Sequence, residues 1–401
     1  MTIEKTHIIS RRQFVGLAAV GAALPWLAGP GRLFGAEGLV TSLPAGVPPG
    51  VGVILANTLK RAPETLNTDW FGTLLMHGLL RWSRRGVCDA RAYAEAWFDY
   101  HSHQEKVAKF QGPPSRLVRA AGIPISTYVS HYGLAMPCYE MAIQFKHERA
   151  RQACIDIAQA VVHQSHRTFY GMVDHDDSAA FAIPDACYFA ITPLMLASDL
   201  DEEHRELFRE EAIEQVRRYT DIFFNRRTGL TKTMLKKDGM GKTYWTRATG
   251  WLLWAMTSVL RYLPETDPRR PAMLYDLEVM ADGVARVQDP GGGLHVLLDD
   301  PTTPLETTGT AMDALGFHEA VRRGWLDRRY NKVIGPAWKF VKKNITDDGQ
   351  IVHAFTGWAG PAEERRMVMD HQKQEWVPGF ILRVSDEMTT EASTTLTTNQ
   401  T

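Results

Sequence analysis

The segment at residues 244–251, YWTRATGW, brings two indoles and a guanidinium into one short stretch of chain. Arginine has planar donors that bind a carboxylate through two parallel hydrogen bonds, and the faces of tryptophan stack on sugar rings. Trp245, Arg247 and Trp251 therefore indicate a binding site for an acidic sugar. A buried tryptophan pair beside a structural arginine is the alternative that these residues alone leave open.

These three side chains need a particular local structure to meet. On one continuous helix they would not form a single stripe, because neighbours on a helix face are three or four residues apart. We therefore expect a turn that ends near Thr249 and a helix that begins at Trp251. An apolar pattern at residues 256–263 continues that helix.

The rest of the chain between residues 51 and 385 repeats helical patterns separated by short breaks rich in Gly, Pro and Asp. Apolar residues at intervals of three and four predict helices at 150–161, 208–223 and 274–284, and others are expected near 68–85, 89–109, 130–146, 184–197, 306–323 and 327–344. Strand patterns are confined to 293–297 and 349–353, without a βαβ rhythm. The sequence predicts an all-α toroid of helical hairpins, a fold that usually places its site among the loops at one end.

The beginning of the chain has the pattern of an export signal. Residues 10–15, SRRQFV, contain a twin-arginine pair, and the apolar run that follows to about residue 28 is too short to span a bilayer comfortably. We predict a signal peptide at residues 1–36, a linker at 37–50, the toroid at 51–385 and a disordered tail at 386–401. The mature protein would then be periplasmic or secreted, without a membrane anchor.

Composition narrows the range of partners. The 401 residues are 44% hydrophobic and 23% charged, and the net charge of −1 gives no reason to expect nucleic acid or a membrane surface as a partner. The cysteines stand singly in apolar stretches and are interpreted as buried thiols: Cys88, Cys138, Cys154 and Cys187. Residues 174–177, DHDD, are interpreted as a solvated loop rather than a metal site, because consecutive residues rarely converge on one ion. No cofactor is expected, and the oligomeric state stays open.

Four segments, in order, resemble the unsaturated uronyl hydrolases of glycoside hydrolase families 88 and 105. They are IPDACYF at 183–189, WTRATGW at 245–251, the loop from 288 to 301, and ETTGTAM at 306–312 followed by GWLD at 324–327. The resemblance covers about residues 183–345, and the region before residue 140 matches poorly. It implies an (α/α)6 barrel, in agreement with the toroid expected from the helical patterns.

The resemblance also implies a reaction and roles for particular residues. Members of these families act on oligosaccharides that end in a Δ4,5-unsaturated uronic acid, whose enol ether is protonated by an aspartic acid and then hydrated. Asp185 occupies the acid/base position, although a plain helix-terminus carboxylate would look the same. Arg247 matches a residue near the substrate, with Trp245 and Trp251 as stacking or wall groups. Glu306 matches too, but is interpreted as a helix cap.

Two departures from the family pattern bear on the substrate. Where the family usually has a second active-site aspartate, residues 127–133 read TYVSHYG, and His131 is the nearest titratable side chain. Where members often have an aromatic residue and a histidine, residues 228–233 read TGLTKT, and Lys232 could contact a substrate carboxylate. A helix-entry histidine and a solvated lysine are the structural alternatives.

The departures keep two other functions open. One is hydrolysis of a saturated glucuronide on the same barrel, and the other is a non-catalytic carbohydrate-binding barrel that no longer needs an acid at position 185. A polysaccharide lyase is disfavoured because the motifs match the hydrolases. In every case the expected partner is an oligosaccharide with a terminal uronic acid.

Overall fold

A computed structural model describes residues 39–107, 116–175, 181–237, 239–354 and 376–390. The chain divides into two units, residues 1–34 and 35–401, and all described residues belong to the second. The predicted signal peptide, residues 1–36, lies outside the described residues.

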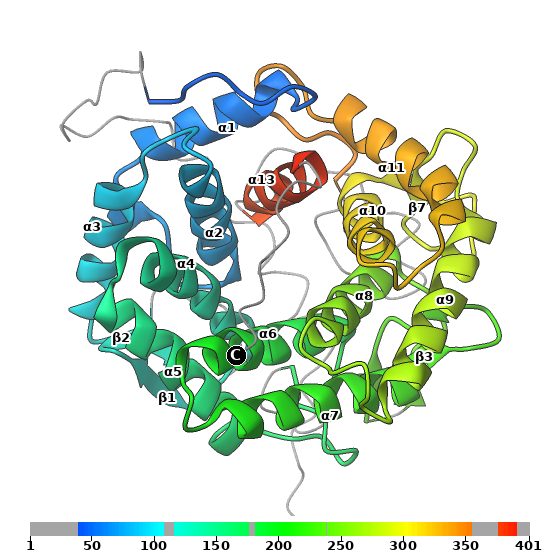
Figure 1. Cartoon of the computed structure of the whole chain (residues 1–401), viewed down its shortest axis with the longest axis horizontal. Coiled ribbons are helices and arrows are strands. Elements are labelled where there is room, and N and C mark those ends of the chain that lie inside the picture. Colours follow the sequence, from blue (N-terminus) through cyan, green and yellow to red (C-terminus); the bar gives the residue numbers. More distant parts are fainter. Residues whose placement is uncertain (1–38, 108–115, 176–180, 238, 355–375, 391–401) are drawn as a thin grey trace, which may run out of the picture. The chain divides into compact units, whose positions relative to one another are not determined.

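Within the second unit the helices form two concentric rings (Figure 1). The outer ring comprises α1 (Pro49–Lys60), α3 (Arg91–Ser102), α5 (Glu148–His163), α7 (Arg205–Phe223), α9 (Arg270–Val287) and α11 (Asn331–Lys343). The inner ring comprises α2 (Trp70–Arg84), α4 (Ala135–Phe145), α6 (Pro184–Leu200), α8 (Thr246–Leu260), α10 (Thr307–Arg322) and α13 (Trp376–Thr389). The predicted (α/α)6 barrel is thereby confirmed.

The two rings differ in how their side chains are buried. Outer helix α7 buries one stripe, as its three-four pattern predicts: Phe208, Ala212, Val216, Tyr219 and Phe223. Inner helix α8 is buried at every position except Ser258, because it packs against neighbours on all sides. Inner helices also approach closely, and a side chain at Gly250 of α8 would clash with Met312 of α10.

Short strands and 3-10 turns fill the connections between helices. Four antiparallel pairs join β1 (Leu117–Ala120) to β2 (Ile123–Ser126), β3 (Phe224–Asn225) to β4 (Leu230–Thr231), β5 (Leu235–Lys236) to β6 (Gly239–Met240), and β7 (Leu294–His295) to β8 (Leu305–Glu306). The 3-10 turns are η1 (Pro63–Thr65), η2 (Val129–Leu134) and η3 (Arg328–Tyr330). Of the strand expected at 293–297, two residues form β7. The segment 349–353 contributes an isolated bridge, between Ile351 and Ile345.

Two predicted boundaries were wrong. Helix α8 begins at Thr246 with Trp245 as its N-cap, so there is no turn extending to Thr249. The C-terminal boundary at residue 385 is too early, because α13 continues to Thr389 and the side chain of Asp386 is buried. In both places tertiary packing stabilises a helix that the local sequence does not announce.

The inner helices run parallel, so their first turns meet at one end of the barrel. Along α8 and α10, Thr246 lies against Gly309 and Leu253 lies against Gly316, which fixes the same direction for both helices. Along α2 and α13, Trp70 stacks on Trp376 at the start and Arg81 pairs with Asp386 near the end. The candidate site lies at the end where these helices begin.

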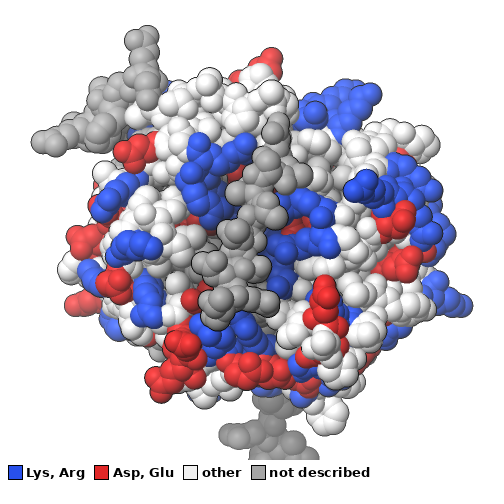
Figure 2. Space-filling view, in the orientation of Figure 1, with Lys and Arg blue, Asp and Glu red and all other residues white. Residues whose placement is uncertain are grey.

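Charged side chains are concentrated where the inner helices end. Arg81 lies within 2.7 Å of Asp386 and 3.3 Å of Glu387, which links α2 to α13. Figure 2 shows basic side chains gathered near the centre of the face it views, with acidic ones among them. Basic residues in a last helical turn offset the partial negative charge of the unpaired carbonyls there. Among the described residues, none of the helices combines the length and apolar character required to cross a membrane.

Candidate active site

Asp185 lies in the first turn of α6, directly after Pro184, and is partly buried. Proline is favoured at this position because its missing N–H would have no helical partner anyway. The Oδ1 atom of Asp185 is buried and has no hydrogen-bond partner among the described residues. A buried oxygen without a protein partner is unusual and calls for a ligand, a water or a chemical role.

The surroundings of Asp185 raise its pKa to about 6. Burial is the largest cause, because a charged carboxylate loses solvation there, and it outweighs the opposing effect of the Arg247 guanidinium. The backbone N–H of Asp185 and the indole of Trp251 also favour the carboxylate, with smaller effects. A carboxyl group with this pKa is populated in both protonation states near neutral pH, as acid/base chemistry requires.

Arg247 is buried in the first turn of α8, with its side chain between two indoles. Its guanidinium carbon lies 4.2 Å from the ring centroid of Trp245 and 5.0 Å from that of Trp376. Burial lowers the pKa of Arg247, whereas the carboxylates of Glu306 and Asp185 raise it. Arginine nevertheless keeps its charge in proteins, so a desolvated cation lies beside the candidate acid.

Trp251 follows Arg247 by one helical turn and lies deeper in the barrel. Its ring is 1% exposed and packs against Tyr188 and Phe189, with centroids 5.0 and 5.3 Å away. Both contacts come from α6, the helix that carries Asp185. The structure therefore places Trp251 as a wall behind the acid, with its faces covered by protein.

Two tryptophans of this region were missed by sequence reasoning. Trp376 begins α13 and contacts Arg247, and Trp70 begins α2 and stacks on Trp376 with ring centroids 5.1 Å apart. Trp70 follows Asp69, whose carboxylate caps α2 by accepting hydrogen bonds from Phe71 and Gly72. An aromatic residue directly after a helix cap was the available signal, but nothing local connects it to Arg247.

His131 lies in η2, which packs against α6. Its Nδ1 atom accepts a hydrogen bond from the Ser126 backbone N–H at 3.0 Å and lies 2.8 Å from the Ser126 hydroxyl. Burial lowers the pKa of His131 to about 4. The imidazole is therefore neutral at pH 7, and we expect no ionisation between pH 6 and 7 from this side chain.

The loop before α6 contributes a second histidine. The Nε2 atom of His175 lies 3.3 Å from the Tyr128 hydroxyl, and its ring packs on Phe181 at 5.2 Å between centroids. Asp174 is buried, so the interpretation of residues 174–177 as a solvated loop was wrong for this residue. Asp176 and Asp177 lie outside the described residues.

Lys232 is partly buried beside the segment that leads into α8. Its Nζ atom lies 4.0 Å from the ring centroid of Tyr244 and donates a hydrogen bond to the Lys242 carbonyl oxygen at 3.2 Å. The ammonium is therefore engaged with the protein, and its contact with a substrate stays a prediction.

Glu306 caps α10, as its sequence context predicts. Its carboxylate accepts hydrogen bonds from the backbone N–H groups of Thr308, at 3.0 Å, and Gly309. The same carboxylate favours the charged form of Arg247, so it joins the helix start to the candidate site. Within the described parts of the chain, no three His, Cys, Asp or Glu side chains are grouped as metal ligands would be.

Comparison with known proteins identifies relatives of this chain. The family model described as Glycosyl Hydrolase Family 88 matches residues 56–389. The "Unsaturated rhamnogalacturonyl hydrolase YesR" of Bacillus subtilis (strain 168) is 23% identical over 240 residues, which cover 58% of this chain and 68% of that protein. The "Unsaturated 3S-rhamnoglycuronyl hydrolase" of Alteromonas sp. (strain LOR) is 30% identical over 120 residues, or 29% of each protein.

Solved structures share the fold. A possible member of the GH105 family from Salmonella enterica superposes with a TM-score of 0.71 at 18% sequence identity, covering 89% of this chain and 98% of that one. The similarity extends over both rings, including the region before residue 140 where sequence motifs match poorly.

Proposed function

The chain belongs to glycosyl hydrolase family 88, and from this premise we propose that it removes a terminal Δ4,5-unsaturated uronic acid from oligosaccharides. The observation that carries the proposal is a carboxyl group with a pKa of about 6, Asp185, beside the buried cation of Arg247. The named relatives, both unsaturated uronyl hydrolases, support the substrate class.

The proposed reaction uses Asp185 twice. Its protonated form donates a proton to C4 of the C4=C5 enol ether, which leaves positive charge at C5. The resulting carboxylate then accepts a proton from the water that adds at C5, and the hemiketal opens to release the remaining sugar. Because the hydration takes place away from the anomeric carbon, the carboxylate separations of retaining and inverting glycosidases do not apply.

Arg247 is proposed to bind the uronate carboxylate. The guanidinium packs against the rings of both Trp245 and Trp376, which lowers the entropic cost of fixing it for a bidentate contact. A uronate bound there would bring its ring to the first turns of α6 and α8. His131, neutral at pH 7, would supply a polar group rather than a second carboxylate.

The test is turnover of lyase-digested pectin, ulvan and glycosaminoglycans, followed by loss of the enol-ether absorbance and by released sugar. Asp185→Asn keeps the shape of the side chain and removes its proton, so we expect at least about a 10²–10⁴-fold loss of rate in a folded protein. Wild-type turnover by that variant would return Asp185 to a purely structural role.

A second candidate is hydrolysis of a saturated glucuronide, which the absence of a second carboxylate at residues 127–133 favours. Release of sugar from a saturated glucuronide, with none from any unsaturated digest, would establish it. A carbohydrate-binding barrel without activity would bind both and turn over neither.

Export through the twin-arginine pathway is part of the proposal, supported by residues 10–15. Replacing both Arg11 and Arg12 by lysine should retain the protein in the cytoplasm, whereas the unchanged chain should be recovered from the periplasm or the medium. The same distribution between cytoplasm and periplasm for the variant and the unchanged chain would contradict export by this pathway.

A further inference from the structure

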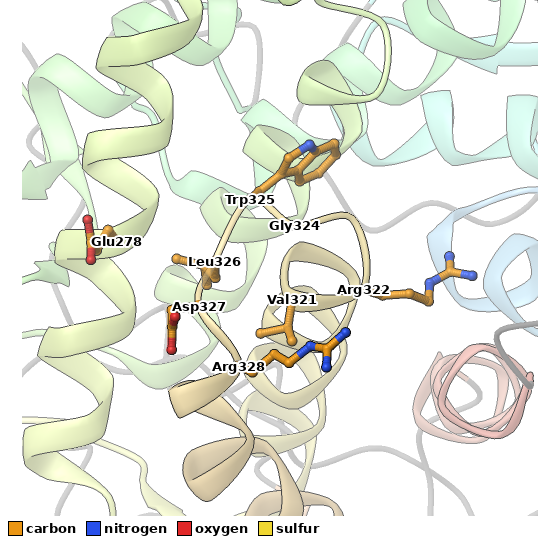
Figure 3. A pocket seen from close by; sticks show the side chains of 8 residues that line it. All are labelled: Glu278, Val321, Arg322, Gly324, Trp325, Leu326, Asp327 and Arg328. Atoms are coloured by element: carbon orange, nitrogen blue, oxygen red, sulfur yellow. The ribbon is translucent and has the colours of Figure 1, made fainter.

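A groove lies at the C-terminal end of α10, where the chain turns towards η3. A cavity of about 650 Å³ is bordered by side chains of the turn and by Glu278 of α9 (Figure 3). A second cavity of about 340 Å³ adjoins it and shares Gly324 and Trp325 as a common wall. The two cavities and this wall are called the Trp325 groove. Its larger cavity falls within the range of sites for small ligands.

Trp325 is held rigidly in this wall. The guanidinium carbons of Arg323 and Arg270 lie 5.3 and 5.8 Å from its ring centroid. Arg270 donates hydrogen bonds to two backbone carbonyls, at 3.0 and 2.7 Å, and Arg323 is paired with Glu319. The backbone N–H of Trp325 donates to the Ala320 carbonyl at 2.8 Å. The indole is therefore fixed before any ligand arrives, and it remains partly exposed.

Some charged side chains of the groove are paired within the protein and others are not. Glu278 pairs with Arg329 at 3.0 Å, and the Asp327 carboxylate accepts the backbone N–H of Arg329 at 2.6 Å. Arg322 pairs with Glu319 at 2.8 Å. Arg328 is exposed and has no ion pair or hydrogen bond from its side chain within the described ranges. Of the described residues, Arg328 is thus the cation of the groove that stays available to a ligand, and the Asp327 carboxylate beside it keeps its charge.

We propose that the Trp325 groove binds a uronic-acid segment of a polysaccharide, as a second site separate from Asp185. The part of the indole that remains exposed offers a surface for a sugar ring, and Arg328 offers a fork for its carboxylate. Helix α10 has 16 residues and so spans roughly 24 Å between Glu306 and this groove. One short substrate therefore does not reach both, and the groove would hold the protein on its polymer.

This inference rests on the proposed function for its choice of sugar, but its test does not need turnover. The Asp185→Asn chain is titrated with saturated trigalacturonate, and binding is followed by calorimetry. Adding Trp325→Ala or Arg328→Ala should weaken the titrated binding at the groove at least about tenfold, the effect of losing a single stacking or charge-assisted contact. In the active chain, the same two changes should leave turnover of an unsaturated disaccharide unchanged.

A matched control is Trp338→Ala. Trp338 is also partly buried and has Lys342 5.9 Å from its ring, but it lies on α11 and does not border the groove. Unchanged binding in Trp325→Ala, or equal loss in Trp338→Ala, would overturn the site. Equal affinity for neutral maltotriose would show that the site does not select acidic sugars. If the measured binding depended on self-association of the protein, the groove would be a protein interface instead. Failure of turnover with intact groove binding would contradict the proposed function alone.

Discussion

At the scale of single residues, the proposed chemistry depends on a partly buried carboxyl group and a buried guanidinium. Burial raises the pKa of Asp185 more than Arg247 lowers it, which leaves the carboxyl group with a pKa of about 6. The carboxylates of Glu306 and Asp185 both favour the charged form of Arg247, against the effect of its burial. The helix cap of α10 therefore helps to keep the cation beside Asp185 charged.

The pH dependence of kcat/KM should report Asp185 and not His131. Because the first step needs the protonated acid, the rate should fall as pH rises through about 6. His131, with its pKa lowered to about 4, is already neutral there. His131→Gln should therefore leave the alkaline limb in place, and loss of that limb would assign it to the imidazole instead.

Arg247→Lys should weaken activity because one ammonium cannot reproduce the fork of the guanidinium. We expect a loss of about 10- to 100-fold in kcat/KM, the usual effect of a charge-assisted bond of about 1.5–3 kcal/mol. The loss should be smaller for the methyl ester of the uronate than for the free acid. Equal losses on ester and acid, or a lower Tm with unchanged kinetics, would make Arg247 structural.

At the scale of elements, helix starts position the site. Inner helices α6, α8, α10 and α13 contribute Asp185, Arg247, Glu306 and Trp376 from their first turns or caps. Partial positive charge at a helix N-terminus favours anions, which suits a uronate and a transient carboxylate alike. The helix N-termini thus add a shared positive potential to the charges of the individual side chains at this end of the barrel.

One inner helix carries a carboxyl group that weakens it. Asp313 of α10 is buried, neither of its carboxyl oxygens has a hydrogen-bond partner among the described residues, and burial followed by repulsion from Glu306 raises its pKa well above the usual range. A raised folded-state pKa means that stability is lost as pH rises above the unfolded value of about 3.9.

Asp313→Asn should therefore stabilise the protein near pH 7, by at least about 1 kcal/mol, because the amide is uncharged in both states whereas the carboxyl group must take up a proton on folding. The difference in the free energy of unfolding should shrink towards about pH 3, below the unfolded pKa of about 3.9, where the wild-type carboxyl group is mostly protonated in both states. Denaturant unfolding at the two pH values measures it. A variant less stable at both would show that Asp313 has a favourable role.

At the scale of the whole barrel, closure of the rings depends on α13. This helix packs against α2, the first inner helix, and Gly379 lies so close to Leu75 that a side chain there would clash. At the other end of the pair, Asp386 binds Arg81 at 2.7 Å and Arg85 at 3.2 Å. Helices α2 and α13, which are far apart in the sequence, are thus joined by close packing near Gly379 and by ion pairs at Asp386.

Arg81→Met should destabilise the barrel by about 3–5 kcal/mol, because it leaves buried carboxylates without their partner. Against the effect of burial, Arg81 and other arginines hold the pKa of Glu387 below its usual range, and a hydrogen bond with His77, followed by the charge of Arg81, lowers the pKa of Glu140 to about 2. Their contribution to stability is present above the unfolded pKa of about 4.3 and disappears as pH falls towards 2. The Tm difference between wild type and variant should narrow over that range, and a constant difference would indicate lost packing alone.

The sequence by itself predicted most helices, the barrel and the local positions of Glu306 and Asp185. The three-four spacing at residues 208–223 reports which side of α7 is buried, because a helix repeats every 3.6 residues whatever it packs against. The positions of Glu306 as a helix cap and of Asp185 at a helix start could also be predicted from neighbouring residues, because each depends on the few residues that follow it.

Only the tertiary structure decided what those residues face. Arg247 meets Trp376, 129 positions further along the chain, because α13 closes the ring between α10 and α2. The pKa values of Asp185 and His131 follow from burial, which no spacing in the sequence states. Hydrophobic periodicity predicts which face of a helix is buried but not which residues pack against it. The proposed chemistry of this site depends on those packing partners.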